Sequence, residues 1–277
     1  MKSELNWGSA PIAWGQRSSW FDPVTDWLSA ETNSDEIRSL RRQGGLELCW
    51  GELEWRDVYE NVCDVEFETS AQELAQALCD TSLRVFHGCR VEDASVFLEQ
   101  GIRLNDPSEL EARARRLACL APHQESLLQN LEQFVKEEDS FNRDIGALHL
   151  ALDDRELIGD CSHYALYGSE WILSALGWSA HSLLRSFGIP PIIEVEIPIR
   201  DVSPAMRKAL SDQILQEWVH FSINQPDWVP VVDFGICLRK PIPPSQITGH
   251  YHPKSLVDVF HEKVVRTTAK SACPSCA

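Results

Sequence analysis

The fold is decided by a segment in the first half of the chain, SLRVFHGCRV at residues 82–91, followed by ASVFLEQGIRL at residues 94–104. The first run is apolar and β-prone, so it predicts a strand. His87 and Gly88 end that strand, a short helix follows, and Gly101 ends the helix before a second β-prone run. Because Gly88 has no Cβ, we expect a flat ligand to lie against the backbone there, with the His87 ring facing it.

Composition limits the partners that this chain can have. Its 277 residues are 43% hydrophobic and 24% charged, and 42 acidic against 25 basic residues give a net charge of −17. Such a surface repels phosphate backbones, so we expect a protein partner rather than a nucleic acid. No apolar run is long enough to cross a bilayer, and the nine cysteines form no framework. We therefore expect a cytoplasmic protein that does not engage membranes.

The first 30 residues contain four tryptophans, Trp7, Trp14, Trp20 and Trp27, with glycines and prolines between them. The glycines and prolines exclude one continuous helix. We expect the four indoles to be buried, because four exposed tryptophans would promote aggregation. The alternative is an exposed arm that binds a partner.

Hydrophobic periodicity predicts alternating helices and short strands along the whole chain. We expect helices at 35–43, 70–79, 106–136 with a break at Pro122, 203–218 and 256–264, and strands at 46–50, 62–67, 148–152, 189–199 and 229–238. A capping box of Ser70 and Glu73 would begin the second of these helices.

These elements predict an α+β fold with a mixed, largely antiparallel split sheet and flanking helices. The absence of a G-x-G-x-x-G motif argues against a doubly wound nucleotide-binding fold. We expect three parts: an N-terminal Trp-rich helical region at 1–80, a body at 81–250, and a C-terminal helix and tail at 251–277.

A second informative stretch runs from residue 158 to 177, IGDCSHYALYGSEWILSALG. Tyr164, Tyr167 and Trp171 recur at helical spacing, and so do His163, Tyr167 and Glu170. An aromatic stripe is usually core. This one also carries hydroxyls, an imidazole and a carboxylate beside glycines, so a site and a core face are both open interpretations.

The segment from Phe86 to Arg90, the helix after it, and GIRL at 101–104 resemble the opening of ADP-ribosyltransferase folds of the poly(ADP-ribose) polymerase and diphtheria-toxin type. The Tyr-rich stretch at 164–170 and the late run VDFGI at 232–236, which leads into PIPPSQI at 241–247, resemble later parts of bacterial and phage members. The resemblance covers residues 83–250.

The resemblance implies an NAD site with named contacts. His87 and Gly88 would hold a ribose hydroxyl or the adenosine side, and Arg90 would pair with the pyrophosphate. Tyr164 or Tyr167, with Ser169 in the same segment, would sandwich the nicotinamide ring.

A catalytic carboxylate is also implied, and three candidates remain open: Glu170, Asp233 and Glu217. Cleavage of the nicotinamide–ribose bond develops positive charge on the sugar, and a carboxylate near that carbon stabilises it. The resemblance thus implies an NAD-dependent ADP-ribosyltransferase, of a toxin or effector kind, that modifies a macromolecular acceptor, preferably a protein. The alternative is a non-enzymatic acidic binding protein, an inhibitor or adaptor, on a degenerate form of this fold.

Two other chemistries have weaker support in the sequence. Cys89 near His87 and Cys161 near His163 suggest a cysteine nucleophile, but catalytic Cys–His pairs are normally distant in sequence. Cys273 and Cys276, with His250 and His252, suggest a zinc site, but a single C-x-x-C near the chain end is a weak signal. We therefore predict no metal and expect a frayed tail there.

Overall fold

The computed structural model describes residues 5–43, 54–224, 229–230, 233–268 and 273. The chain forms two compact units, a helical unit of residues 1–84 and 197–232 and a sheet unit of residues 85–196 and 233–277. The first division lies close to the boundary expected at residue 80. Residues 197–232, expected in the body of the fold, belong instead to the helical unit.

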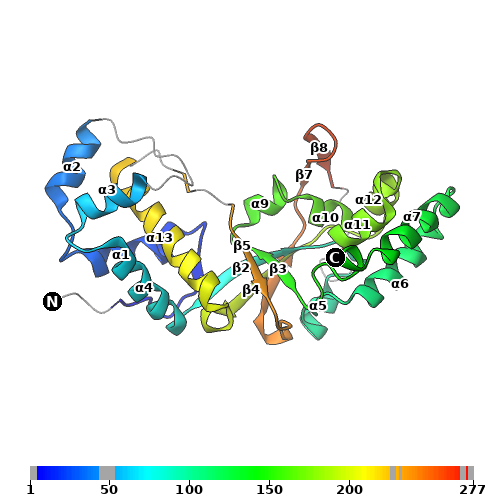
Figure 1. Cartoon of the computed structure of the whole chain (residues 1–277), viewed down its shortest axis with the longest axis horizontal. Helices are drawn as coiled ribbons and strands as arrows, with labels where there is room; N and C mark the ends of the chain where they lie inside the picture. Colours follow the sequence, from blue (N-terminus) through cyan, green and yellow to red (C-terminus); the bar gives the residue numbers. More distant parts are fainter. Residues whose placement is uncertain (1–4, 44–53, 225–228, 231–232, 269–272, 274–277) are drawn as a thin grey trace. The chain divides into compact units, whose positions relative to one another are not determined.

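The helical unit is built around its longest helix, α13 (Pro204–Asn224), which contacts α1, α2, α3 and α4 (Figure 1). Its other elements are β1 (Ile12–Ala13), η1 (Arg17–Ser19), α1 (Phe21–Leu28), α2 (Ser34–Arg42), α3 (Glu54–Val62), α4 (Phe67–Ala77), η2 (Leu78–Asp80) and η4 (Ile199–Asp201). The α13 residues Leu210, Ile214 and Trp218 are at most 1% exposed. Contact with four helices explains why this helix is buried on most of its surface.

The tryptophans of the first 30 residues are all in the core of the helical unit, with exposed fractions between 0% and 9%. Trp14 and Trp20 stack with their ring centroids 4.9 Å apart. The indole N–H of Trp20 donates to the Trp14 carbonyl at 3.2 Å, and that of Trp7 donates to the Ala77 carbonyl at 3.1 Å. The prediction that these indoles are buried is confirmed.

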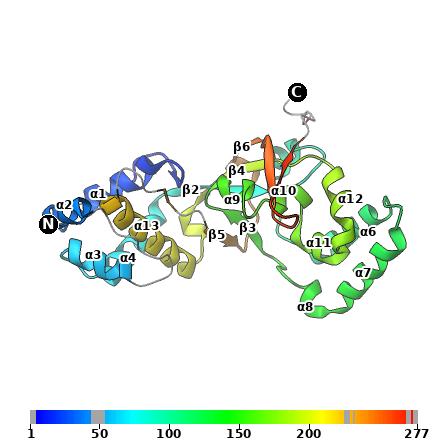
Figure 2. The same ribbon diagram turned by 90° about the horizontal axis from the view of Figure 1, so that it is seen from above.

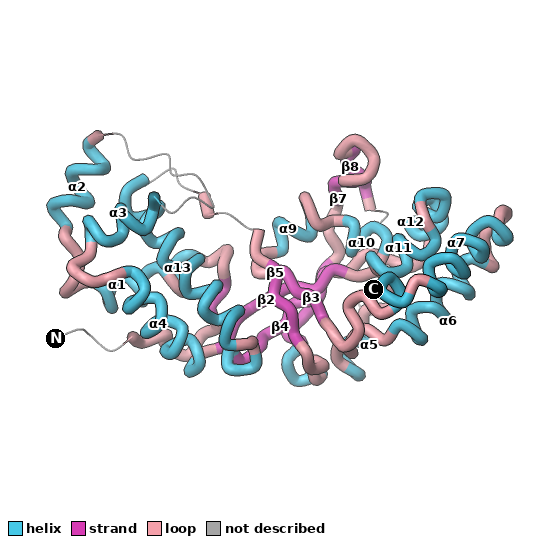
Figure 3. The backbone as a smooth tube through the Cα atoms, viewed as in Figure 1, coloured by secondary structure: helices cyan, strands magenta, loops and turns pink. Residues whose placement is uncertain are grey.

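A largely antiparallel sheet forms the second architectural feature (Figure 3). Its strands are β2 (Ser82–Gly88), β3 (Leu148–Ala151), β4 (Ile192–Pro198), β5 (Gly235–Leu238) and β6 (Ile247–Tyr251), in the order β5-β3-β2-β4-β6. The pairs β2–β3, β3–β5 and β4–β6 are antiparallel, and β1 joins the start of β2 in parallel. A separate hairpin pairs β7 (Ser255–Asp258) with β8 (Val264–Thr267).

Helices of the sheet unit enclose their own apolar core, in which α11 packs on α6 and α7 (Figure 2). They are α5 (Ser95–Gln100), α6 (Pro107–Ala118), α7 (Gln124–Lys136), α8 (Glu138–Phe141), α9 (Asp154–Ile158), α10 (His163–Tyr167), α11 (Glu170–Leu176) and α12 (His181–Ser186), with the short turns η3 (Trp178–Ala180) and η5 (Pro244–Gln246). The break expected at Pro122 is confirmed between α6 and α7.

The expected α+β class, with a largely antiparallel sheet and flanking helices, is confirmed, but three local predictions are wrong. Residues 62–67 are not a strand; they join the end of α3 to the start of α4. The α4 helix starts at Phe67, so Ser70 is a buried helical residue and not a cap. Residues 256–264 form a β hairpin, not a helix. The strand expected at 46–50 lies outside the described residues.

Among the described residues, no helix is both long enough and apolar enough to cross a membrane. The longest, α13, carries charged and amide side chains along its length.

Candidate functional site

The end of β2 is covered by two segments that follow β3. A Cβ added at Gly88 would lie 3.1 Å from the Leu157 Cδ2 and 3.3 Å from the Tyr164 Cβ. The absence of a side chain at Gly88 therefore lets α9 and α10 approach the strand closely. Protein side chains fill the space in which we expected a flat ligand to lie on Gly88, so its backbone contributes only to the edge of the site.

His87 is half-buried and has a defined tautomer. Its Nδ1 lies 3.2 Å from the backbone carbonyl of His149, and because a carbonyl only accepts, Nδ1 carries the proton. Burial lowers the pKa of His87, against a smaller opposite effect of that hydrogen bond. The neutral ring therefore has an Nε2 able to accept a hydrogen bond from a ligand hydroxyl.

Tyr164 of α10 and Glu170 of α11 form a hydrogen-bonded pair. The Tyr164 hydroxyl donates to the Glu170 Oε2 at 2.9 Å, and the His163 ring lies against the Tyr164 ring with centroids 4.2 Å apart. Burial, followed by the Glu170 charge, raises the pKa of Tyr164. The phenol is thus neutral at physiological pH and orients one oxygen of a partly exposed carboxylate.

Ser169 links this pair to the next helix. It is the N-cap of α11, and its Oγ accepts from the Ile172 N–H at 3.4 Å. Gly168, immediately before it, has φ 92°, and a Cβ there would lie 2.9 Å from the Arg90 Cβ. Only glycine fits this close approach with a left-handed backbone. The sharp turn brings Ser169 and Glu170 next to Tyr164.

Five of the predicted site residues line one cavity of ≈ 430 Å³ within the sheet unit. They come from the end of β2, from α10 and from the start of α11: His87, Gly88, Tyr164, Ser169 and Glu170. The volume lies in the range of small-molecule and cofactor sites. Segments that are far apart in the sequence thus meet around one space.

Arg90 is in a different place from the one expected. Arg90 is 9% exposed and does not line the cavity. Its guanidinium donates to the backbone carbonyls of Phe187 at 2.6 Å and Gly188 at 3.1 Å. It also donates to the carbonyls of Ala165 and Arg185. Burial lowers the pKa of Arg90 to about 10. These contacts use its donors on the chain itself, so the expected pairing with a pyrophosphate is not supported.

Tyr167 also lies away from the cavity. It is 3% exposed, its hydroxyl donates to the Asp258 Oδ1 at 2.7 Å, and the Arg185 Nη1 donates to that hydroxyl at 3.1 Å. Of the two tyrosines expected to stack on nicotinamide, only Tyr164 lines the cavity.

The three candidate carboxylates are separated by the fold. Glu170 lines the cavity. Asp233 is exposed and does not line the cavity, but it lies two residues before Gly235, which does. The charge of Asp233 contributes to raising the pKa of Glu156. Glu217 belongs to α13 in the helical unit, is 0% exposed, accepts from Gln213 at 3.3 Å and does not line the cavity.

Sequence reasoning missed a further carboxyl group in the cavity wall. Glu156 follows the N-cap of α9, and the Cys161 thiol donates to its Oε1 at 3.2 Å. Burial raises the pKa of Glu156, and burial together with Glu156 raises the pKa of Cys161 to about 12. A thiol protonated at neutral pH is a poor nucleophile, which argues against a cysteine mechanism here. The acidic run DDRE at 153–156 was the available signal.

Two arginines of the cavity wall were also missed. Arg113 of α6 donates to the Arg90 carbonyl at 2.7 Å, and Arg103 pairs with Glu109 at 3.0 Å with 70% of its side chain exposed. Both therefore have guanidinium donors left for an anionic ligand. The basic cluster RARR at 113–116 was the sequence signal available for Arg113.

Comparisons with known proteins identified no relative of this chain. The chain matches no protein-family model, no curated protein and no solved structure.

Proposed function

We propose that the cavity binds NAD and that the protein transfers ADP-ribose from NAD to a protein side chain, with release of nicotinamide. The observation that supports this most is that one cavity is lined by His87, Tyr164 and Ser169, which the resemblance implies as NAD contacts, and by Glu170, one of the three candidate catalytic carboxylates. Arg113 and Arg103 take the role in pyrophosphate binding that was expected of Arg90.

The residues fit distinct parts of the dinucleotide. His87, with Nδ1–H held by the His149 carbonyl, accepts a ribose hydroxyl at Nε2. Tyr164 offers an aromatic face for the nicotinamide ring, because its hydroxyl is held by Glu170. The other oxygen of Glu170 faces the sugar carbon that reacts.

In the proposed reaction, the bond between the nicotinamide nitrogen and the ribose C1′ breaks, and its electron pair leaves with nicotinamide. Positive charge develops on the ribose, and the Glu170 carboxylate stabilises it. The acceptor nucleophile then forms a bond to C1′ and loses its proton to solvent. A carboxyl of raised pKa, such as Glu156, is suited to take up that proton transiently.

The test measures nicotinamide release and transfer of labelled ADP-ribose to proteins of a cell lysate. We expect His87→Ala and Glu170→Gln to lower both by roughly 10²–10³-fold, the usual cost of removing a group that stabilises transition-state charge. The matched control is Glu138→Gln, an exposed carboxylate of α8 outside the cavity wall, which should leave both unchanged. The same two activities are measured in Asp233→Asn and Glu217→Gln, the variants of the other two candidate carboxylates.

One observation favours the alternative, a non-enzymatic acidic binding protein. The described cavity wall carries five carboxylates, against two arginines: Asp106, Glu109, Asp144, Glu156 and Glu170. Such a wall attracts cationic groups more readily than a pyrophosphate. If no nicotinamide is released and no label is transferred under any condition, the binding function remains and the transferase is excluded.

A further inference from the structure

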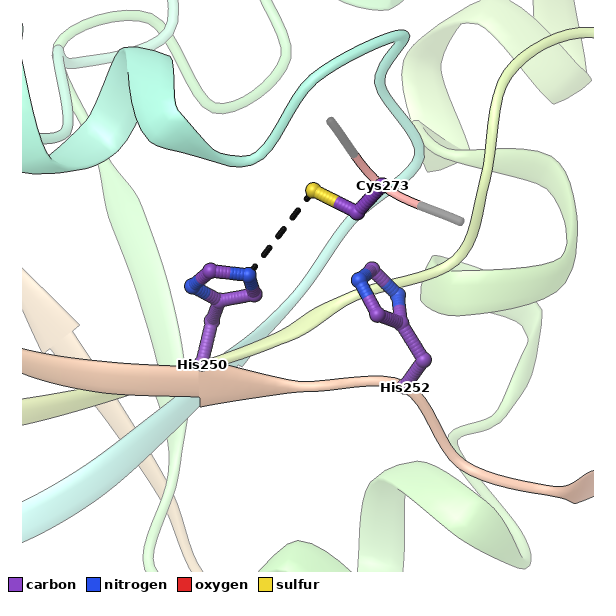
Figure 4. Close-up of side chains that lie close together, drawn as sticks. All are labelled: His250, His252 and Cys273. Carbon is purple, nitrogen blue, oxygen red and sulfur yellow. Dashed lines mark hydrogen bonds between the residues drawn. The ribbon is translucent and has the colours of Figure 1, made fainter. Parts of the chain in front are cut away.

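A second cluster of chemically active side chains lies on β6, apart from the residues of the cavity wall. His250 is paired with Ile193 of β4, and His252 follows the strand directly. Residues two apart on extended chain point to the same face. Figure 4 shows both imidazole rings on one side of β6.

Cys273 lies over the same face of the strand. It is 0% exposed, and its Sγ lies 3.8 Å from the His250 Nε2 and 3.5 Å from the Asp93 Oδ1. One ligand atom from each of His250, His252 and Cys273 lies within 4.8 Å of the other two. The residue expected to belong to a frayed tail therefore closes a compact group of two imidazoles and a thiol.

His252 has few hydrogen-bond partners of its own. Both of its ring nitrogens are shielded from solvent and make no hydrogen bond to a described side chain; the partner recorded for the ring is the backbone of Pro190. A histidine with one nitrogen held by a backbone carbonyl has its other nitrogen available to a metal ion, the usual arrangement of metal-bound imidazoles. This observation is independent of the distances within the cluster.

We propose that His250, His252 and Cys273 bind a zinc ion. In a tetrahedral zinc site with the usual bond lengths, neighbouring nitrogen and sulfur ligands lie roughly 3.6 Å apart and two nitrogens roughly 3.4 Å apart. The observed 3.8 Å between His250 Nε2 and Cys273 Sγ needs only a small contraction, and the other separations, at most 4.8 Å, need side-chain shifts of about 1 Å. The Asp93 carboxylate, which now accepts from the thiol, is placed to take up the proton that the thiol loses when it binds the ion as thiolate.

The donor set selects among metals. Calcium and magnesium require oxygen ligands, whereas imidazole and thiolate together suit zinc. Bound there, the ion would link Cys273 to β6 and keep a fourth coordination position for solvent or another ligand. The site consists of these three residues, and Cys276 lies outside the described residues.

The experiment uses the full chain, expressed without a metal-binding tag. Zinc is measured by elemental analysis after purification and again after reconstitution with zinc chloride and dialysis. Cobalt replaces zinc in a parallel sample, because a thiolate–cobalt charge-transfer band reports the sulfur ligand directly. Cys273→Ser and His252→Ala are compared with Cys119→Ser and His123→Ala, exposed residues of the same types.

We expect one equivalent of zinc in the wild type and both controls, at least a tenfold weaker affinity in His252→Ala, and loss of the cobalt charge-transfer band in Cys273→Ser. Circular dichroism verifies that every variant is folded. Absence of zinc and of cobalt binding in the folded wild type, or an unchanged charge-transfer band in Cys273→Ser, overturns the proposal. None of these readouts depends on transferase activity.

Discussion

The two tyrosines of α10 lie three residues apart on the same helical turn, and their surroundings differ. Tyr164 lines the cavity and donates to Glu170, whose side chain is 43% exposed. Tyr167 donates to Asp258, which is 0% exposed and is also held by Arg266 at 2.9 Å and Arg185 at 3.6 Å. The first pair is open to a ligand, and the second is part of the folded core.

This difference separates a residue of the motif that is available to a ligand from one that stabilises the fold. A hydrogen bond to a buried, multiply paired carboxylate contributes to folding, and one to a partly exposed carboxylate contributes little. Substitutions on the Asp258 side should therefore change stability, and those on the Tyr164 side should change ligand binding.

The largest effect is expected for Asp258→Asn. It leaves Arg266 and Arg185 without their buried partner, which costs about 3–5 kcal/mol of the free energy of unfolding. Urea unfolding followed by circular dichroism measures this loss. The control is Asp160→Asn, an exposed carboxylate paired with Lys263, which should change stability by about 0.5 kcal/mol or less.

The same variant should also change the pH dependence of stability. Burial alone would raise the pKa of Asp258, but the hydrogen bonds from Tyr167 and Arg266 outweigh it and lower the pKa below the ordinary 3.8. Its contribution is therefore fully present above pH 3.8 and is lost as the pH falls through the lower folded-state pKa. In Asp258→Asn this acid-dependent part should disappear; an unchanged acid profile would show that Asp258 is not the group concerned.

Tyr167→Phe should have the next largest effect on stability. It removes the hydrogen bond donated to the buried Asp258 and the one accepted from Arg185, of which the first alone costs about 1.5–3 kcal/mol, and it leaves the cavity wall intact. We expect the thermal midpoint to fall while NAD affinity stays within twofold. A large loss of affinity with unchanged stability would reverse the assignment of the two tyrosines.

Gly88→Ala tests the close approach of α9 and α10 to β2. The new methyl group would lie 3.1–3.3 Å from Leu157 and Tyr164, so these side chains must shift, at a cost of about 1–2 kcal/mol. Because Tyr164 lines the cavity, ligand affinity should fall as well. The control is Gly249→Ala in β6, because Gly249 lies outside the cavity wall and a Cβ there would have the end of the Glu194 side chain, at 4.0 Å, as its nearest neighbour.

Tyr164→Phe should have the smallest effect on stability, about 0.5–1.5 kcal/mol, because Glu170 remains partly hydrated. The aromatic face is kept and the hydroxyl that orients Glu170 is lost, so nicotinamide release should fall more than NAD affinity. Steady-state kinetics separates the two. Equal losses of stability in Tyr164→Phe and Tyr167→Phe would contradict the comparison.

The fold class and part of the candidate site could be predicted from the sequence for identifiable reasons. The strand that ends at His87-Gly88, the break at Pro122 and the buried tryptophans follow from local patterns. The spacing of Tyr164 and Tyr167 placed both on one helix, but it carries no information on which of them meets Glu170 and which meets Asp258. That choice depends on β7, about 90 residues further along the chain.

The β7–β8 hairpin shows why other elements were missed. Its turn places Glu262 at φ 53° and Lys263 at φ 54°, a left-handed conformation that is normally signalled by glycine or asparagine. Without that signal, the apolar spacing of the segment favoured a helix. Arg90 was misassigned for a related reason, because the carbonyls that bind its guanidinium come from residues 165 and 185–188.

The most direct test of the central claim is hydrogen–deuterium exchange of the full chain with and without NAD. We predict slower exchange on NAD binding in residues 84–92 and 161–172, which supply His87, Tyr164 and Glu170, and no change in α1 or α2 of the helical unit. Unchanged exchange throughout at saturating NAD, or protection confined to the helical unit, would contradict the assignment of the cavity as the NAD site.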